Sequence, residues 1–250
     1  MYKLLGTVLV ASILVFSLAS MANAGWTETW ESYTSGSTPY DNWSLGNGTW
    51  IGLGAPNHTT GGSKSYQITG GSTSRISKPL GFTATDQTSI TLEAWFYDSN
   101  GGTSSKRTWV GLQNGVAVDN AMVRIGCNNA PAGYQLHYYN SALVTVNTGL
   151  GNETGWHYTK LVFTKQSGSN WKIDWRIDNA AQTQQYTGSV TYAWTAATAS
   201  TVTLGYNYST TAEVDWDDIT LSNQPVPEPS SLLALGAGLA GMLGLVRRRR

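Results

Sequence analysis

Residues 156–178 are WHYTKLVFTKQSGSNWKIDWRID, and they carry the clearest structural signal in the chain. From residue 171 to residue 178, apolar and charged side chains alternate without a break. A period of two places the apolar set on one face of a β-strand and the charged set on the other. The small and polar residues Gln166–Ser169 separate this arm from the preceding apolar run. The stretch therefore predicts a hairpin of strands 156–165 and 170–178, with one face in the core and the other in water.

The same pattern recurs along the middle of the chain. Residues 89–98 (SITLEAWFYD) alternate in the same way, and Asn100-Gly101-Gly102 ends the run. Further strands are predicted at residues 106–112, 122–127, 134–139, 143–147, 201–206 and 213–221. Many short strands, little helical periodicity and no internal repeat predict an all-β fold, a two-sheet antiparallel β-sandwich.

The first 24 residues predict an N-terminal secretory signal peptide. Lys3 precedes an apolar run from Leu4 to Ala19, and Ala22-Asn23-Ala24 supplies the small residues of a cleavage site. Gly25 is therefore expected to be the first residue of the mature chain. The alternative is a retained N-terminal anchor, which the well-formed cleavage site disfavours.

The last 26 residues, 225–250, are PVPEPSSLLALGAGLAGMLGLVRRRR and have three parts in a fixed order. The triplet Pro227-Glu228-Pro229 comes first, and an uncharged apolar run from Ser231 to Val246 follows it. The chain then ends in the cluster Arg247, Arg248, Arg249 and Arg250. An apolar run stopped by arginines is typical of a transmembrane helix with its basic end in the cytoplasm. An ordinary C-terminal anchor is one explanation of this pattern.

The order, spacing and position of these three parts resemble a PEP-CTERM sorting signal. The resemblance implies an exosortase-type processing enzyme as a partner, and membrane anchoring through the C-terminal helix before processing. It also implies delivery to the cell surface or extracellular matrix of a Gram-negative-type bacterium. Because it covers 26 of 250 residues, the resemblance predicts a destination and says nothing of activity.

Residues 25–224 remain as one β-sandwich domain, a length that such a fold can reach without splitting. Lys3 and the four terminal arginines account for five of the 15 basic residues, and Glu228 for one of the 15 acidic ones. The domain is left with 10 basic and 14 acidic residues, a net charge of about −4. It has no basic stripe to neutralise phosphates, so we expect no nucleic-acid partner. The single Cys127 excludes an internal disulfide and is expected to be buried in a strand.

Three segments resemble concanavalin A-like and LamG-like jelly rolls. They are Trp30-Glu31-Ser32-Tyr33 with the PYDNW of residues 39–43, the hairpin at 156–178, and the closing EVDWDDITL of residues 213–221. The resemblance implies two packed sheets that bind glycans on a concave face or on rim loops. It also implies a structural Ca²⁺ that clips the first and last strands together, with Glu31, Asp217 and Asp218 as its ligands. Hard cations take carboxylate oxygens, but these acids could equally cap strand ends or turns.

A glycan-binding face is predicted from residues that alternate with core positions. Pyranose rings stack on aromatic faces, while amides, carboxylates and guanidinium groups bind their hydroxyls. The candidate ligand-binding residues are Glu93, Trp95, Tyr97, Arg124, Gln135, His137 and Tyr139. They form one platform only if their strands are neighbours, and a loop over the face would make them a second core instead.

The sequence predicts a protein that is not an enzyme. Glycoside hydrolysis needs two carboxyls about 5 to 9.5 Å apart, and the candidate pairs are Asp174 with Asp178 and Asp215 with Asp217. The first pair lies in an alternation of acids and bases that is typical of a solvated face. The Glu-x-Asp-x-x-Glu strand of hydrolases with this fold, the Gly-x-Ser-x-Gly motif and common metal-ligand spacings are absent.

Two hypotheses about function follow. The first is an exported, surface-sorted, non-catalytic β-sandwich that binds extracellular polysaccharide or glycan. The second is a structural envelope or biofilm-matrix protein that makes protein–protein contacts without binding sugar. A concave groove with exposed aromatic side chains favours the first, and a flat or loop-filled face favours the second. A glycoside hydrolase is a distant third.

Overall fold

The predicted hairpin is present and belongs to the larger of two sheets. β11 (Gly155–Lys165) and β12 (Asn170–Asp178) pair antiparallel from Thr159 opposite Ile177 to Lys165 opposite Trp171. The computed structural model describes residues 25–33, 43–46, 51–54, 56–68, 75–82, 88–99, 101, 107–113, 121–128, 133–140, 142–168, 170–193, 199–205 and 214–225. The regular structure of these residues is β-strand, which confirms the all-β class.

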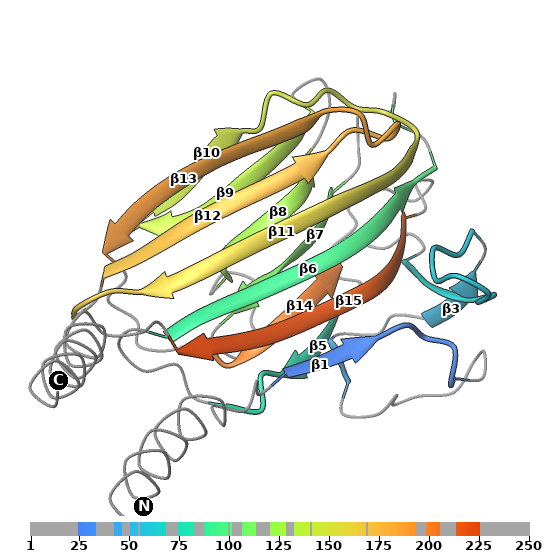
Figure 1. Cartoon of the computed structure of the whole chain (residues 1–250), viewed down its shortest axis with the longest axis horizontal. Coiled ribbons are helices and arrows are strands. Elements are labelled where there is room, and N and C mark those ends of the chain that lie inside the picture. The colour runs from blue at the N-terminus through green and yellow to red at the C-terminus, as the bar shows by residue number, and fades with distance from the viewer. Residues whose placement is uncertain are drawn as a thin grey trace, which may run out of the picture.

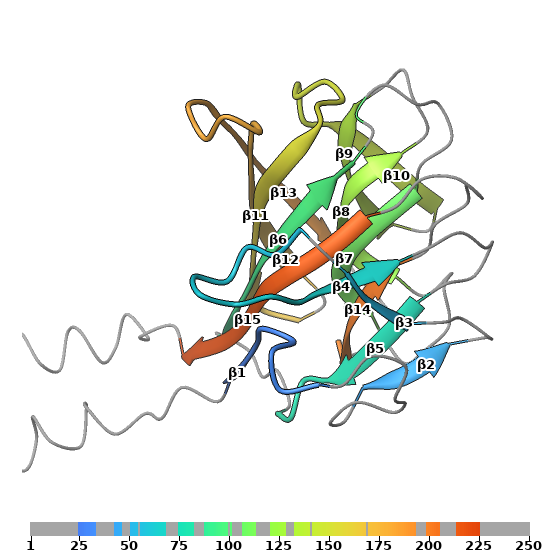
Figure 2. The same cartoon turned by 90° about the vertical axis from the view of Figure 1, so that its right-hand side faces the viewer.

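The strands form two antiparallel sheets, shown from the front in Figure 1 and as two layers in Figure 2. Sheet A has the order β13 (Gln185–Ala193), β12, β11, β6 (Thr88–Asp98), β15 (Val214–Pro225), β4 (Ser65–Ile68) and β3 (Ile51–Gly54), and β1 (Gly25–Glu28) also pairs with β15. Sheet B has the order β10 (Ala142–Asn147), β9 (Tyr134–Asn140), β8 (Ala121–Asn128), β7 (Arg107–Gln113), β14 (Thr201–Gly205), β5 (Arg75–Pro79) and β2 (Ser44–Gly46). The predicted two-sheet antiparallel sandwich is therefore confirmed.

The hydrophobic core lies between the sheets, where alternation along each strand directs one set of side chains. On β12, Trp171 and Ile173 are buried, whereas Lys172 between them is half-exposed. β8 and β9 supply the opposing layer from sheet B, including Ile125 and Leu136. Each large apolar side chain buried in this way contributes roughly 1.5 to 3 kcal/mol relative to leaving it exposed.

One polar cluster links the two sheets inside this core. The hydroxyl of Tyr134, on β9, lies 3.0 Å from Asp98 Oδ2 on β6 and 3.1 Å from His157 Nε2 on β11. Burial, with the neighbouring Cys127 and Asp98, raises the pKa of this hydroxyl above its ordinary value. Tyr134 therefore keeps its proton, and Cys127 is buried as expected.

The two terminal segments of the sequence cannot be compared with this structure. The predicted signal peptide (residues 1–24), the sorting triplet and the apolar run with its arginine cluster lie outside the described residues. Among the residues that are described, none belongs to a helix long and apolar enough to cross a membrane.

Leu161 and Val162 are adjacent on β11 but face opposite sides, and they test the alternation directly. Leu161 is fully buried and Val162 is half-exposed. Leu161→Ala should lower the free energy of unfolding by about 2 to 5 kcal/mol, because it leaves a cavity in the core. Val162→Ala should cost less than about 1.5 kcal/mol. Urea titrations of residues 25–225 measure both, and equal losses would contradict the assigned faces.

Candidate functional site

The outer face of sheet B carries two rows of side chains that cross four neighbouring strands. From β7 to β10, the directly paired residues of one row are Gly111, Arg124, His137 and Thr145. The paired residues of the next row are Trp109, Gly126, Gln135 and Asn147. At about 4.8 Å between strands, each row is about 14 Å long.

Direct contacts join the two rows into one network. The guanidinium carbon of Arg124 lies 4.8 Å from the centre of the Trp109 ring, and the His137 ring centre lies 4.3 Å from it. Arg124 Nη2 and His137 Nδ1 are 3.5 Å apart. His137 Nε2 is 3.2 Å from Gln135 Oε1, and Gln135 Nε2 donates to Asn147 Oδ1 at 2.6 Å. Five side chains from four strands are thus held in fixed relative positions.

The members of this network differ in exposure, so some can only support their neighbours while others can contact a ligand. Trp109 and His137 are each only 3% exposed, whereas Arg124 is half-buried and Asn147 is exposed. The Trp109 ring therefore supports Arg124 and His137 and offers little surface for stacking a sugar. The accessible aromatic surface lies beside the network, where Tyr139 pairs with Leu143 and the two are 40% and 51% exposed.

Glycine residues make room for the large side chains on this face. Both cross-strand neighbours of Trp109 are glycines, Gly126 on β8 and Gly205 on β14. Gly111 lies opposite Arg124, and a Cβ atom at Gly111 would collide with the carbonyl oxygen of Val123. A β-branched or bulky residue at these positions would displace the network.

The charge on the outer face of sheet B is positive among the described residues. Arg124 is the cation of the network, and by register Arg75 on β5 and Arg107 on β7 also stand at outward positions of this sheet. The registers of β2, β5 and β14 add the polar residues Ser44, Ser77 and Thr203. Among the described residues of these strands, none that faces outward is Asp or Glu. The domain is acidic overall, but this face carries Arg124 and no described carboxylate, so locally it suits a negatively charged ligand.

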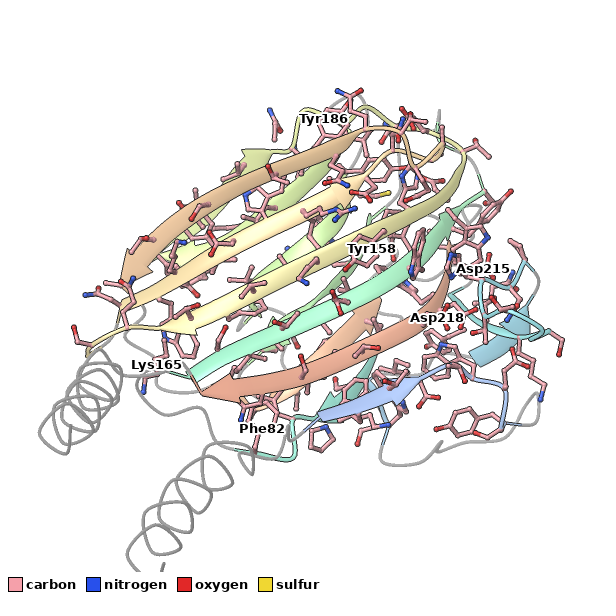
Figure 3. The ribbon with its side chains drawn as sticks, viewed as in Figure 1. Phe82, Tyr158, Lys165, Tyr186, Asp215 and Asp218 are labelled. Carbon is pink, nitrogen blue, oxygen red and sulfur yellow. The ribbon has the colours of Figure 1, made fainter. Side chains whose placement is uncertain are left out.

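The outer face of sheet A carries a different cluster, visible in Figure 3 around Tyr158. His58 stacks on Trp95 with ring centres 3.8 Å apart, and it also contacts the edge of Trp156 at 5.3 Å. Tyr158 lies next to Trp95, with ring centres 5.3 Å apart, and it donates a hydrogen bond to the Glu93 carboxylate. The stacked His58 covers one face of Trp95, which is therefore not an open platform.

The seven residues predicted to bind a glycan are divided between these two faces. β6, which carries Glu93, Trp95 and Tyr97, lies in sheet A, whereas β8 and β9 lie in sheet B. The strands are not neighbours, so one platform with all seven residues does not form. Sheet B brings together the other four, which are Arg124, Gln135, His137 and Tyr139. Whether either set binds a ligand stays a prediction.

The predicted calcium ligands lie where a loop meets β15. Asn57 Nδ2 is surrounded by three oxygens: Glu31 Oε1 at 2.8 Å, the Lys64 carbonyl at 2.7 Å and Asp217 Oδ2 at 3.1 Å. Two carboxylates and a carbonyl are ligand types that Ca²⁺ prefers, and the amide nitrogen occupies the point on which they converge. Glu31 and Asp217 therefore meet at the Asn57 amide, and the calcium clip stays a prediction.

Asp218 does not share that point of convergence. Its carboxylate accepts a hydrogen bond from Thr59 Oγ1 at 2.6 Å and lies 2.7 Å from His58 Nδ1. Its backbone has a positive φ of 45° at an irregularity in the pairing of β15 with β6, as at a β-bulge. Among the described residues, no group of three His, Cys, Asp or Glu side chains converges on a metal position.

The two acidic pairs considered for catalysis are engaged in other contacts. Asp174 pairs with Lys172 at 2.9 Å, and Asp178 pairs with Arg176. Asp217 is fully buried and accepts hydrogen bonds from the backbone amides of His58 and Thr59 at 2.8 and 3.1 Å. Burial raises the pKa of the Asp217 carboxyl above its ordinary value, although these amides oppose the rise.

Sequence reasoning did not identify Trp109, Asn147 or His58. Trp109 and Asn147 stand in strand patterns that were recognised, so an explicit pairing of neighbouring strands would have placed both on the outer face. His58 lies in a loop, and its contact with Trp95 joins residues 37 positions apart. No local signal points to that contact.

Solved structures with similar folds agree with the sandwich. The globular domain of calreticulin from T. cruzi is 9% identical, with a TM-score of 0.53 and coverage of 92% of this chain and 100% of that one. The CBM2 module of the evolved Dit of Lactobacillus casei BL23 phage J-1 is 9% identical, with a TM-score of 0.50 and coverage of 83% and 99%. Alginate lyase Aly36B is 11% identical, with a TM-score of 0.50 and coverage of 79% and 96%. At these identities the likeness shows the fold alone, and no curated protein sequence matches the chain.

The C-terminal segment has a firmer assignment. Residues 225–250 match the PEP-CTERM protein-sorting motif. The PEP-CTERM motif marks an exported bacterial protein that is anchored in the membrane and then processed by an exosortase. It begins at Pro225, the last residue of β15, so the sorting segment follows the closing strand directly.

Asn57→Ala tests the contacts that hold the loop to β15. The change removes the common donor of three oxygens, two of them carboxylate oxygens, and should lower the free energy of unfolding by about 1 to 3 kcal/mol. Added Ca²⁺ should recover part of the loss, because the vacated point is lined by oxygen ligands. Thermal melts with calcium and with chelator measure both effects, and Asn170→Ala, at an exposed asparagine, is the control. Identical melts in calcium and chelator would show that the carboxylates serve the loop alone.

Glu93 should make folding stability depend on pH in the acid range. Burial alone would raise the pKa of its carboxyl, but hydrogen bonds from Lys160 and Tyr158 outweigh burial and hold the pKa below its ordinary value. The stabilisation is present above the unfolded pKa of about 4.3 and is lost as pH falls through the lower folded pKa. Glu93→Gln should cost about 0.5 to 1 kcal/mol at neutral pH and nothing near pH 2. Urea titrations across pH measure this, and a gap that persists at pH 2 would contradict the assignment.

Proposed function

We propose that this exported, surface-sorted protein is a non-catalytic binder of extracellular polysaccharide, and that the outer face of sheet B is its binding face. The proposal adopts the jelly-roll type of sandwich that the sequence resemblance implies. It further specifies an acidic polysaccharide, with carboxylate or sulfate groups along the chain, as the ligand.

The observation that carries the proposal is the network of Arg124, His137, Trp109, Gln135 and Asn147 across β7 to β10. Arg124 offers a positive charge and the exposed Asn147 offers an amide, and the indole holds the guanidinium in place at 4.8 Å. His137 and Gln135 are buried and hold the other members in position. A guanidinium fixed in this way can bind a carboxylate or sulfate through two parallel hydrogen bonds. Side-chain order in the free protein lowers the entropic cost of binding.

The direction of the two rows also suits a polymer. They run across the strands for about 14 Å, and they lead from the buried Trp109 toward the exposed Asn147 and Thr145 at β10. Tyr139, 40% exposed and two residues from His137, supplies an accessible ring for one sugar unit. The absence of outward-facing carboxylates on the described strands removes repulsion toward an acidic chain.

The proposal of a binder without catalysis rests on the acidic residues. Of the carboxyls that hydrolysis would need, Asp174 and Asp178 pair with Lys172 and Arg176. Asp215 accepts a hydrogen bond from Ser65, and Asp217 accepts one from the loop that contains His58. A specific observation also favours the structural hypothesis, in which copies of the chain contact each other, because one edge strand is neutral and exposed. The two functions can coexist in one matrix protein.

Binding of a uronic-acid polysaccharide, a sulfated polysaccharide and a neutral glucan to residues 25–225 tests the proposal. Affinity electrophoresis at two salt concentrations should show binding to an acidic polymer that weakens as salt rises. Arg124→Gln should weaken it about ten- to hundredfold, the range expected for losing one charge-assisted contact. Lys172→Gln removes the same charge from the outer face of sheet A and should leave binding unchanged.

Three other outcomes would each redirect the proposal. Binding lost in Lys172→Gln and kept in Arg124→Gln would move the site to sheet A. Shortening of the polymer, measured by new reducing ends, would show catalysis. Failure of the folded domain to retain any polymer would leave the structural hypothesis.

A further inference from the structure

β13 forms one edge of sheet A, and it carries no charged residue. Its nine residues are QYTGSVTYA, and Figure 1 shows it at the rim of the sheet, with β12 as its neighbour on the inner side. In the part of the chain that the structure describes, no strand pairs with its other side. An edge strand of this kind presents N–H and C=O groups outward, where a further strand can pair.

The usual protections of an edge strand are missing from β13. It pairs with β12 at every position, from Gln185 opposite Asp178 to Ala193 opposite Asn170, and the register has no bulge. It has no proline and no lysine, which are the residues that commonly block edge pairing. Its outward-facing residues Thr187, Ser189 and Thr191 are all exposed.

The sequence of β13 is partly symmetric about its centre, with Gly188 opposite Val190 and Gln185 opposite Ala193 as the exceptions. About Ser189, the strand has Thr187 on one side and Thr191 on the other, then Tyr186 on one side and Tyr192 on the other. Antiparallel pairing of two such strands about Ser189 therefore places Thr opposite Thr and Tyr opposite Tyr. Pairs of these residue types stabilise antiparallel sheets.

We propose that β13 is a self-association edge whose partner is β13 of a second copy of this chain. The two strands pair antiparallel about a twofold axis at Ser189 and join two copies of sheet A into one continuous sheet. The contact is isologous, so it closes as a dimer and does not propagate into a fibre. It uses sheet A alone and leaves the outer face of sheet B free on both copies.

Because β13 is uncharged, it is better suited to pair with a second copy of itself than with a charged strand. A self-pairing strand meets its own charges, and β13 has none to repel. The nearest charges lie one strand back on β12, where Lys172, Asp174 and Arg176 alternate in sign. A basic or acidic partner strand would find no opposite charge on β13.

A cysteine at the twofold position tests the register. In the proposed pairing Ser189 lies opposite Ser189 of the second copy, with Cα atoms about 4.5 to 5.5 Å apart, within the range of a disulfide. Ser189→Cys in the full chain should therefore give a dimer band on a non-reducing gel after mild oxidation. The native Cys127 is only 2% exposed, so the unmodified chain gives the background.

Gln185→Cys is the matched control, because it is exposed and lies on the same face of the same strand. Its opposite residue in the proposed pairing is Ala193, and its own copy lies about 27 Å away along the strand. Gln185→Cys alone should give no dimer band above background, whereas Gln185→Cys combined with Ala193→Cys should give one. Equal bands from Ser189→Cys and Gln185→Cys would indicate random collision and overturn the register.

Ser189→Lys tests the association itself without a cross-link. It places two like charges opposite each other at the axis, while the monomer keeps an exposed strand position that tolerates lysine. The full chain in mild detergent should sediment as a dimer, Ser189→Thr should remain dimeric, and Ser189→Lys should sediment as a monomer. Absence of the Ser189→Cys band together with a monomeric unmodified chain would overturn the proposal. Polysaccharide binding is measured separately, so failure here leaves the glycan proposal untouched.

Discussion

The position of β15 between β6 and β4 is the constraint on which the rest of the structure depends. β15 comes from the end of the described chain, yet it pairs with β6 over ten positions and with β1 along four. The free side of β6 then takes β11, β12 and β13 in order, which leaves β13 as the rim of the sheet. On the outer side of β15, Asp217 accepts a hydrogen bond from the loop that carries His58. The His58 ring then stacks on Trp95 and covers part of it.

Local pattern predicted the strands of this fold well and predicted their neighbours poorly. The 170–178 arm was recognised because its inward side is wholly apolar and its outward side wholly polar. β13 was missed although Tyr186, Val190 and Tyr192 on its inward side alternate with Thr187, Ser189 and Thr191 on its outward side. Gly188 interrupts the inward side, so the alternation in hydropathy is weak. Pairing between distant strands leaves no local trace, which is why β6 was grouped with β8 and β9 although they lie in different sheets.

The candidate site was half predicted for the same reason. Alternation placed Arg124, Gln135 and His137 on one outward face, and the structure brings them together. Their support by Trp109 depends on the pairing of β7 with β8, and on the glycines that flank the indole. The acids predicted to hold calcium were assigned by resemblance. Glu31 and Asp217 meet at Asn57 and Asp218 does not, and the loop that brings the two together follows no sequence pattern.

The sorting motif and the fold meet at one end of the sandwich. Gly25, the expected mature N-terminus, pairs with Ser222, three residues before the motif begins at Pro225. The expected signal peptide and the sorting motif therefore adjoin the domain at neighbouring positions on β1 and β15. Removal of residues 226–250 would leave every described strand pairing of sheet A and sheet B intact. The rows on sheet B and the edge at β13 lie on strands other than β1 and β15, so neither terminal connection is part of them.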